Sequence, residues 1–166
     1  AKTLSPVELL EALIHRVDQV EPVINAFTYR HFDEAMANAK KAEAKYASSQ
    51  RTRALEGLPI GIKDENFIKG KPTSSGSLIM KDFVATETSV GNERILRAGG
   101  IVHARTATPE FSSAGYTNSR LWGVTRNPWN PEFTPGGSSG GSAASLASGT
   151  SAIATGSPRA SDRQRP

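Results

Sequence analysis

The hydrophobic residues near the start of the chain recur at helical spacing and form one apolar stripe. This stripe consists of Leu10, Leu13, Ile14 and Val17. It follows the run Ser5-Pro6-Val7-Glu8, which places serine at the N-cap, proline at the first helical position and glutamate at N3, the pattern of a capping box. Glu21-Pro22 predicts the end of the helix, because a residue that precedes proline disfavours the α region.

A second helix is predicted from about Asp33 to Tyr46, a stretch rich in alanine, lysine and glutamate. Met36 and several alanines supply its inner face. Residues 23–29, between the two helices, are predicted to be extended. Residues 48–56 are polar and are interpreted as a linker.

Beyond Glu56 short apolar runs alternate with helical stretches and polar loops. The predicted elements are a strand over 58–62 that ends at Lys63-Asp64, a loop over 69–77, a helix over 88–97 that stops at Gly99-Gly100, a strand over 101–104, a short helix opening at 109–111, a loop over 115–141, a helix over 142–148 and a buried strand over 152–154. This alternation predicts an α/β architecture in which the strands are at least partly parallel.

Composition and charge exclude several classes of protein. The chain has 166 residues and no cysteine, which excludes a disulfide framework, a thiolate metal site and a cysteine nucleophile. No apolar run is long enough to span a bilayer, so the prediction is a cytoplasmic protein without a membrane partner. The net charge is +4, but half of it lies in residues 157–166. The rest of the chain has no basic stripe interleaved with aromatic residues, so no nucleic-acid partner is predicted.

The run Gly136-Gly137-Ser138-Ser139-Gly140-Gly141-Ser142 is the sharpest local feature. A glycine and serine run is most often a flexible linker. This one is short, follows Pro135 and leads directly into an alanine-rich helix, which favours a structured turn with close backbone approach to a ligand. A phosphate loop is disfavoured, because no lysine follows the glycines in the required pattern.

Lys63 is the second candidate, at the end of an apolar strand. Its ordinary interpretation is a surface lysine paired with Asp64 or Glu65. Its functional interpretation is a desolvated amine that acts as a general base, since burial disfavours the charged form of an amine.

Together these motifs resemble the amidase signature family. The resemblance is carried by GLPIGIKDEN at 57–66, RNPWN at 126–130, PGGSSGGSAA at 135–144 and the opening helix at 5–27. It implies an incomplete part of an α/β/α sandwich with a mixed sheet and surrounding helices. Residues 1–156 would be the N-terminal part of an amidase domain and 157–166 a divergent tail, expected to be disordered. The absence of a starting methionine agrees with a chain that begins inside a longer reading frame.

The resemblance also implies a Ser–cis-Ser–Lys triad that hydrolyses a carboxylic amide through an acyl-enzyme. Lys63 matches the base of the family, and Ser138 matches the serine that follows a cis peptide bond. The loop and substrate-binding residues would be Gly136, Gly137, Ser139 and Gly140. Neither a metal nor an organic cofactor is implied. The partner would be a small-molecule amide, and the residues leave homo-oligomer formation open.

The chain departs from the family pattern after Ser157. The family continues with a second turn, G-[TS]-D-x-G-G-S, whose last serine is the nucleophile and whose backbone N–H groups hold the oxyanion. In register that serine falls at Asp162, and Ser161 lies one residue short of it. We therefore expect a truncated chain that is inactive as an amidase, with a tail typical of an out-of-frame terminus.

Three alternatives accompany this interpretation. One is the amidase-fold A subunit of a tRNA-dependent amidotransferase, which usually carries a Met-Asp-Glu-Phe-like stretch. This chain has Thr108-Pro109-Glu110-Phe111 at that place, which favours a free-standing amidase. The second alternative is a non-catalytic truncated product. The third, an unrelated α/β domain with a glycine and serine linker, is disfavoured because the motifs coincide.

Overall fold

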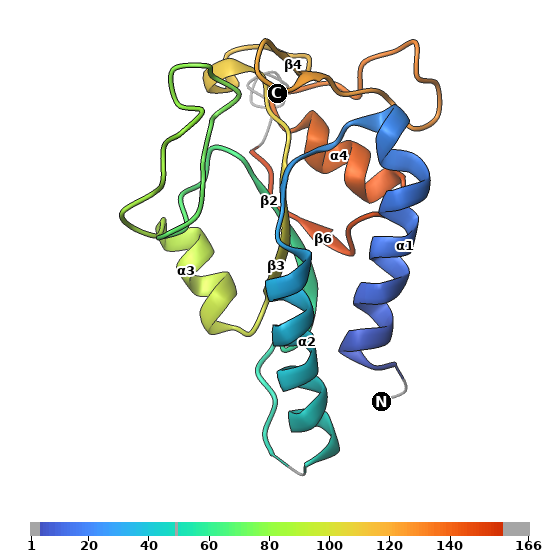
Figure 1. Cartoon of the computed structure of the whole chain (residues 1–166), viewed down its shortest axis with the longest axis vertical. Helices are drawn as coiled ribbons and strands as arrows, with labels where there is room; N and C mark the ends of the chain where they lie inside the picture. Colours follow the sequence, from blue (N-terminus) through green and yellow to red (C-terminus); the bar gives the residue numbers. More distant parts are fainter. Residues whose placement is uncertain (1–3, 49, 158–166) are drawn as a thin grey trace, which may run out of the picture.

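Helices surround a four-stranded sheet in the computed structural model, which describes residues 4–48 and 50–157 (Figure 1). In chain order the elements are α1 (Pro6–Ile24), β1 (Phe27–Arg30), α2 (Phe32–Ala47), β2 (Pro59–Lys63), α3 (Val90–Arg97), β3 (Ile101–Thr106), the 3-10 turn η1 (Glu110–Ser112), β4 (Asn118–Ser119), β5 (Gly123–Val124), α4 (Gly140–Ala147) and β6 (Ile153–Ala154). This order confirms the predicted α/β class.

The sheet has the strand order β1-β3-β2-β6. β2 lies between β3 and β6 and is parallel to both, whereas β1 is antiparallel to β3. The partly parallel pairing predicted from the sequence is confirmed. The carboxyl ends of β2, β3 and β6 therefore meet at one edge of the sheet, which is where ligands bind in many α/β folds.

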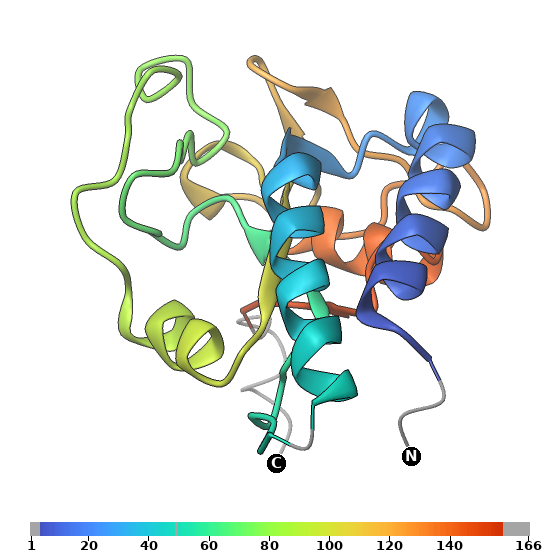
Figure 2. The same cartoon turned by 60° about the horizontal axis from the view of Figure 1, so that its bottom comes forward.

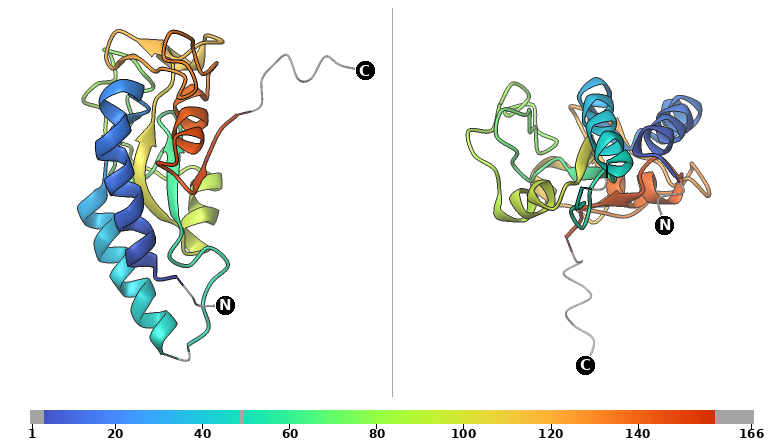
Figure 3. Two further views of the ribbon diagram at one scale, coloured as in Figure 1. Left: turned by 90° about the vertical axis from the view of Figure 1, so that its right-hand side faces the viewer. Right: turned by 90° about the horizontal axis from the view of Figure 1, so that it is seen from below.

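The helices cover both faces of the sheet. α1 and α2 run side by side, and their apolar faces enclose Leu10, Ala35, Ala39 and Ile101 (Figures 1 and 2). α3 lies on the other side of the sheet, where its residues Ile95 and Leu96 pack against a cluster that includes Ile60 and Ile62 (Figure 3). α4 packs on β2, β3 and β6, which brings its first residues to the end of β2.

The predicted end of the first helix is wrong by about one turn. The capping box at Ser5 and Glu8 forms as expected, but α1 continues through Pro22 to Ile24. Proline so close to the end removes few backbone bonds, and the left-handed residue Asn25 closes the helix with its N–H on the Glu21 carbonyl. The extended segment consequently starts at Phe27 rather than at Val23.

Two further predictions are corrected in the second half of the chain. The region predicted as one loop contains the short β4–β5 hairpin, since Asn118 pairs with Val124 and Ser119 with Gly123. The strand predicted as buried, β6, forms but lies at the sheet edge with one neighbour, so that Ile153 is 37% exposed. Within 4–48 and 50–157 no helix is long and apolar enough to cross a membrane. The predicted tail lies outside the described residues, except for Ser157.

Candidate active site

Lys63 ends β2 with its side chain fully buried, at 0% exposure. Its Nζ donates to Ser138 Oγ at 2.7 Å and to Ser157 Oγ at 2.9 Å, and lies 3.0 Å from Glu65 Oε1. The prediction that Lys63 lies on the surface is therefore wrong. The pairing with Glu65 that accompanied this prediction is present. An ammonium has three N–H donors, and this site offers three acceptors.

Ser138 lies in the structured turn that the glycine run forms before α4. The peptide bond between Gly137 and Ser138 is cis, at the position that the family resemblance implies. The turn is crowded by its own chain: a Cβ on Gly140 would lie 2.1 Å from Thr117 Oγ1, and one on Gly137 would lie 2.8 Å from the backbone nitrogen of Tyr116. The backbone at these glycines therefore lies close to other residues of the chain. Gly140 N–H donates to Thr117 Oγ1 and Gly136 has a φ of 87°.

Ser157 reaches the same place from the end of β6. Thr155 anchors this segment, because its Oγ1 accepts from the Lys63 backbone N–H at 2.9 Å. Ser157 N–H in turn donates to Ser139 Oγ at 3.0 Å, so Ser139 joins the two segments. Sequence reasoning did not name Ser157 as a site residue. The available signal was its place shortly after a strand predicted to be parallel to the strand that carries Lys63.

Asp64 and Arg105 fix the backbone at the end of β2. Both side chains are fully buried, and Arg105 Nη2 lies 3.7 Å from Asp64 Oδ1. The same nitrogen donates to the carbonyls of Lys63 and Asn66 at 3.3 and 2.7 Å. Asp64 also accepts from both the N–H and the hydroxyl of Ser74. Burial raises the pKa of Asp64, against the opposing effects of Ser74 and Arg105.

Glu65, expected from the sequence only as a surface partner of Lys63, is a further residue of this site. One of its carboxylate oxygens faces Lys63 Nζ, and the other accepts from the hydroxyl of Ser112 in η1. Ser112 Oγ also lies 2.8 Å from Thr108 Oγ1. Ser112 stands 47 positions from Glu65, so no local pattern could have predicted the contact.

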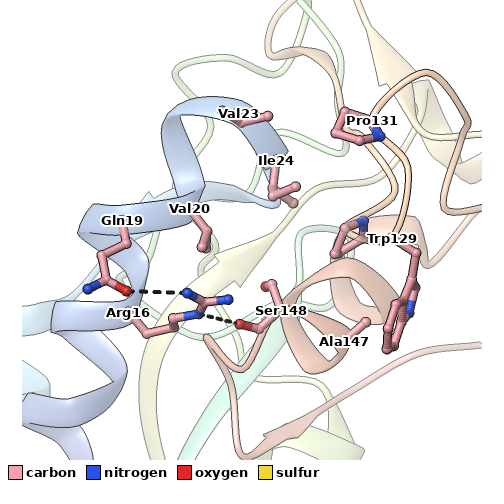
Figure 4. Close-up of a pocket in the computed structure, with 10 residues that line it drawn as sticks. Arg16, Gln19, Val20, Val23, Ile24, Trp129, Pro131, Ala147 and Ser148 are labelled. Carbon is pink, nitrogen blue, oxygen red and sulfur yellow. Dashed lines mark hydrogen bonds between the residues drawn. The ribbon is translucent and has the colours of Figure 1, made fainter.

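A separate pocket of about 460 Å³ lies away from Lys63, between α1, the loop around Trp129 and the end of α4. Figure 4 shows Arg16 reaching from α1 to Ser148, whose carbonyl accepts from Arg16 Nε at 2.9 Å. Trp129 borders the pocket and is 86% exposed. None of the residues predicted for the site lines this pocket. In the described part of the chain, no group of three or more His, Asp or Glu side chains could hold a metal ion.

The chain is similar to curated and structurally known proteins over most of its length. It is 38% identical to the A subunit of the glutamyl-tRNA(Gln) amidotransferase of Gloeothece citriformis (strain PCC 7424), over 94% of this chain and 32% of that protein. The A subunit of the same name from Picosynechococcus sp. (strain ATCC 27264 / PCC 7002 / PR-6) is 40% identical, over 95% of this chain and 32% of the relative. The chain thus spans about a third of the length of these curated relatives.

Solved structures of enzymes share the fold. A bacterial aryl acylamidase of the amidase signature enzymes family superposes with a TM-score of 0.85 at 32% identity, over 92% of this chain and 32% of that one. A 6-aminohexanoate cyclic dimer hydrolase superposes with a TM-score of 0.80 at 33% identity, over 92% of this chain and 30% of that one. The family model described as Amidase matches residues 8–158, and the chain therefore belongs to the amidase family.

Proposed function

We propose that this chain supplies the base and the proton relay of an amidase site that cleaves a carboxylic amide to an acid and ammonia or an amine. The observation that carries the proposal is the 2.7 Å contact between Lys63 Nζ and Ser138 Oγ beside a cis peptide bond. Full burial of Lys63 supports it, because the amine is shielded from bulk water and is held within hydrogen-bond distance of both Ser138 and Ser157.

The proposed reaction is an acyl transfer in two halves. Neutral Lys63 accepts a proton from Ser138, which accepts one from the nucleophilic serine, and that serine oxygen attacks the amide carbonyl. The tetrahedral oxyanion collapses, the C–N bond breaks, and the amine leaves with the proton returned through Ser138. Water then attacks the acyl ester by the same route and releases the acid.

The nucleophile of this scheme is the serine that the family pattern expects at position 162, where this chain has Asp162. We accordingly expect the chain as it stands not to hydrolyse amides. Gly136, Gly137, Ser139 and Gly140 are proposed to shape the loop next to the substrate. The substrate is proposed to be a small-molecule amide, since both the curated relatives and the structural neighbours include amide-processing enzymes.

Reconstruction of the missing turn tests the proposal. The restored variant carries Pro158→Asp, Ala160→Gly, Ser161→Gly and Asp162→Ser, which recreates G-[TS]-D-x-G-G-S in register. We expect a fluorophosphonate probe to label residue 162 of the restored variant, and to label neither the original chain nor a restored variant that also carries Lys63→Met. Labelling is read by mass spectrometry, and thermal melting shows that each variant folds.

Two results would contradict the proposal. One is a folded restored variant that the probe does not label. The other is labelling that is unchanged when Lys63 is replaced, because the hydroxyl would then be activated without the base. Turnover of simple aliphatic or aromatic amides by the original chain, with label on Ser157 or Ser161, would contradict the expected inactivity.

A second candidate function is that of the A subunit of a tRNA-dependent amidotransferase. It is favoured by the 36 to 40% identity to proteins of that name. The stretch Thr108-Pro109-Glu110-Phe111, in place of the usual Met-Asp-Glu-Phe, favours the free-standing amidase. Ammonia release from glutamine by the restored variant, without release of aniline from an aryl amide, would favour the amidotransferase function instead.

A further inference from the structure

Glu65 has no part in the Ser–cis-Ser–Lys scheme, yet its carboxylate lies 3.0 Å from the amine at the centre of that scheme. In the described part of the chain it is the one carboxylate that forms an ion pair with Lys63. We propose that Glu65 is a positioning residue, which holds Lys63 Nζ between Ser138 and Ser157 and neutralises the ammonium that forms when Lys63 takes the proton. The inference rests on the proposed function of Lys63 as the base.

The burial of Lys63 makes a charge partner necessary. Its side chain has 0% exposure, so water does not solvate an ammonium at this place. A buried charge is costly unless it is paired and its donors are bonded. The hydroxyls of Ser138 and Ser157 satisfy two donors but bring no charge. Glu65 satisfies the third donor and supplies the negative charge.

The other charged groups near Lys63 are engaged elsewhere. Asp64 is adjacent in sequence, but its carboxylate accepts from Ser74 and faces Arg105. Arg105 contacts the backbone carbonyl of Lys63 through Nη2 rather than its amine. The assignment of the charge partner therefore falls to Glu65.

The carboxylate of Glu65 is itself held in place, unlike that of an ordinary surface ion pair. Its second oxygen accepts from Ser112, whose hydroxyl also contacts Thr108. The backbone around Ser112 is left-handed, with φ of 48° at Phe111 and 55° at Ser112. The N–H of Phe111 donates to the Ser75 carbonyl at 2.8 Å, which fixes this turn. A pair with both members fixed loses little side-chain entropy on forming, so it can orient the amine.

In this proposal Glu65 acts like the aspartate of a Ser-His-Asp triad, which orients the base and stabilises its protonated form without taking the proton. One proton moves from the Ser138 hydroxyl to Lys63 Nζ, and the amine becomes an ammonium. Glu65 stays a carboxylate throughout. It turns the product of that step from an isolated buried charge into a charge-assisted hydrogen bond.

Nitrogen NMR of the lysine side chains in the full chain tests the pairing without any need for catalysis. Lys63 Nζ and Cε are assigned through the side chain from the backbone, and their chemical shifts are compared among variants. We expect Glu65→Gln to shift both resonances and to speed the exchange of the Nζ protons with water. Ser112→Ala, which leaves both partners present, should move them in the same direction by less. Glu93→Gln, an exposed partner of Arg97 on α3, is the matched control and should leave them unchanged.

The inference is overturned if the Lys63 resonances of Glu65→Gln coincide with those of the original chain, or if Glu93→Gln shifts them equally. In the restored variant, Glu65→Gln should slow fluorophosphonate labelling by at least about tenfold. An unchanged rate would overturn the catalytic part of the inference. A restored variant that is never labelled would count against the proposed function, whereas the NMR comparison would still decide whether Glu65 holds Lys63.

Discussion

The amine of Lys63 lies 2.7 Å from the hydroxyl of Ser138, although 75 positions separate the two residues in the chain. The contact arises because β2 ends at Lys63, and α4 packs on the same strand with Ser138 at its entrance. Parallel strands and the helix between them bring both residues to one edge of the sheet. The chemistry proposed for this chain depends on that single junction.

Replacing Ser138 and Ser139 one at a time should distinguish a serine that relays a proton from one that only holds the turn in place. In the restored variant, Ser138→Ala removes the hydroxyl that passes the proton to Lys63, so labelling should slow by more than about 100-fold. Ser139→Ala loses only the contacts that its hydroxyl makes with Ser157, and its effect should stay below about tenfold. The labelling rate of each variant is measured under identical conditions. Equal losses in the two variants would assign Ser138 a structural function only.

The sequence predicts the individual helices and strands around this site better than the contacts between them. Helical periodicity, the capping box at Ser5 and the apolar run before Lys63 are local signals, and the elements they predict are present. Pro22 misleads because its effect on a helix depends on how much helix follows it. The β4–β5 hairpin was not predicted, because strands of two residues are too short to show a hydrophobic periodicity.

The contact of Glu65 with Ser112 and that of Ser157 with Lys63 were not predicted, for a different reason. Each depends on the register of separate elements: Ser157 on the parallel pairing of β6 with β2, and Glu65 on the turn that carries Ser112. The motifs that carry the resemblance to the amidase signature family name Lys63 and Ser138. They do not name Ser157, which only the packing of β6 on β2 brings to the same nitrogen.

The loss of stability at low pH should depend on Glu56. Hydrogen bonds from Arg53, followed by those from Lys45, lower the pKa of this buried carboxyl to about 2 from its ordinary value of 4.5. A carboxyl whose pKa is lowered by folding stabilises the fold at any pH above the pKa that it has in the unfolded chain. This contribution is lost as pH falls from about 4.5 to about 2. Glu56→Gln should remove a contribution on the order of 1–3 kcal/mol at pH 7 and flatten the curve in that window.

Urea unfolding at pH 7, 4 and 3 measures this contribution. Glu11→Gln, an exposed carboxyl on α1, is the control and should keep the pH dependence of the original chain. A Glu56→Gln variant that loses stability from pH 7 to pH 3 as steeply as the original would show that Arg53 does not hold this carboxylate ionised.

His31 should govern stability in a higher pH window. Burial, followed by repulsion from Lys71 and Arg105, lowers the pKa of His31 to about 4, and its Nε2 has no partner among the described residues. Because the folded chain holds this imidazole neutral, His31 contributes fully to stability above about pH 6.5, and this contribution is lost as pH falls toward 4. His31→Gln should reduce the fall in melting temperature between pH 7.5 and 4.5.

Part of that fall should remain in the His31→Gln variant, because burial also lowers the pKa of His103. His15→Gln changes an exposed imidazole on α1 and serves as the matched control. The prediction is wrong if the melting temperature of His31→Gln depends on pH as strongly as that of His15→Gln.

The first turn of α4 should tolerate no side chain at Gly141. A Cβ there would lie 2.3 Å from the backbone nitrogen of Ala107 and 2.7 Å from the carbonyl oxygen of Ala26, and neither backbone atom can move without shifting a strand end. Gly141→Ala should therefore destabilise the fold by about 2–3 kcal/mol, as overpacking does.

Gly91 in α3 is the matched control, because nothing lies within 4 Å of its Cβ position. Gly91→Ala should be neutral or stabilise the fold by up to about 1 kcal/mol through helix propensity. Urea unfolding measures both variants, and in the restored variant Gly141→Ala should also slow labelling, since α4 carries Ser138 at its entrance. If Gly141→Ala were as stable as Gly91→Ala, the close packing of α4 against the end of β3, and with it the placement of Ser138 beside Lys63, would be wrong.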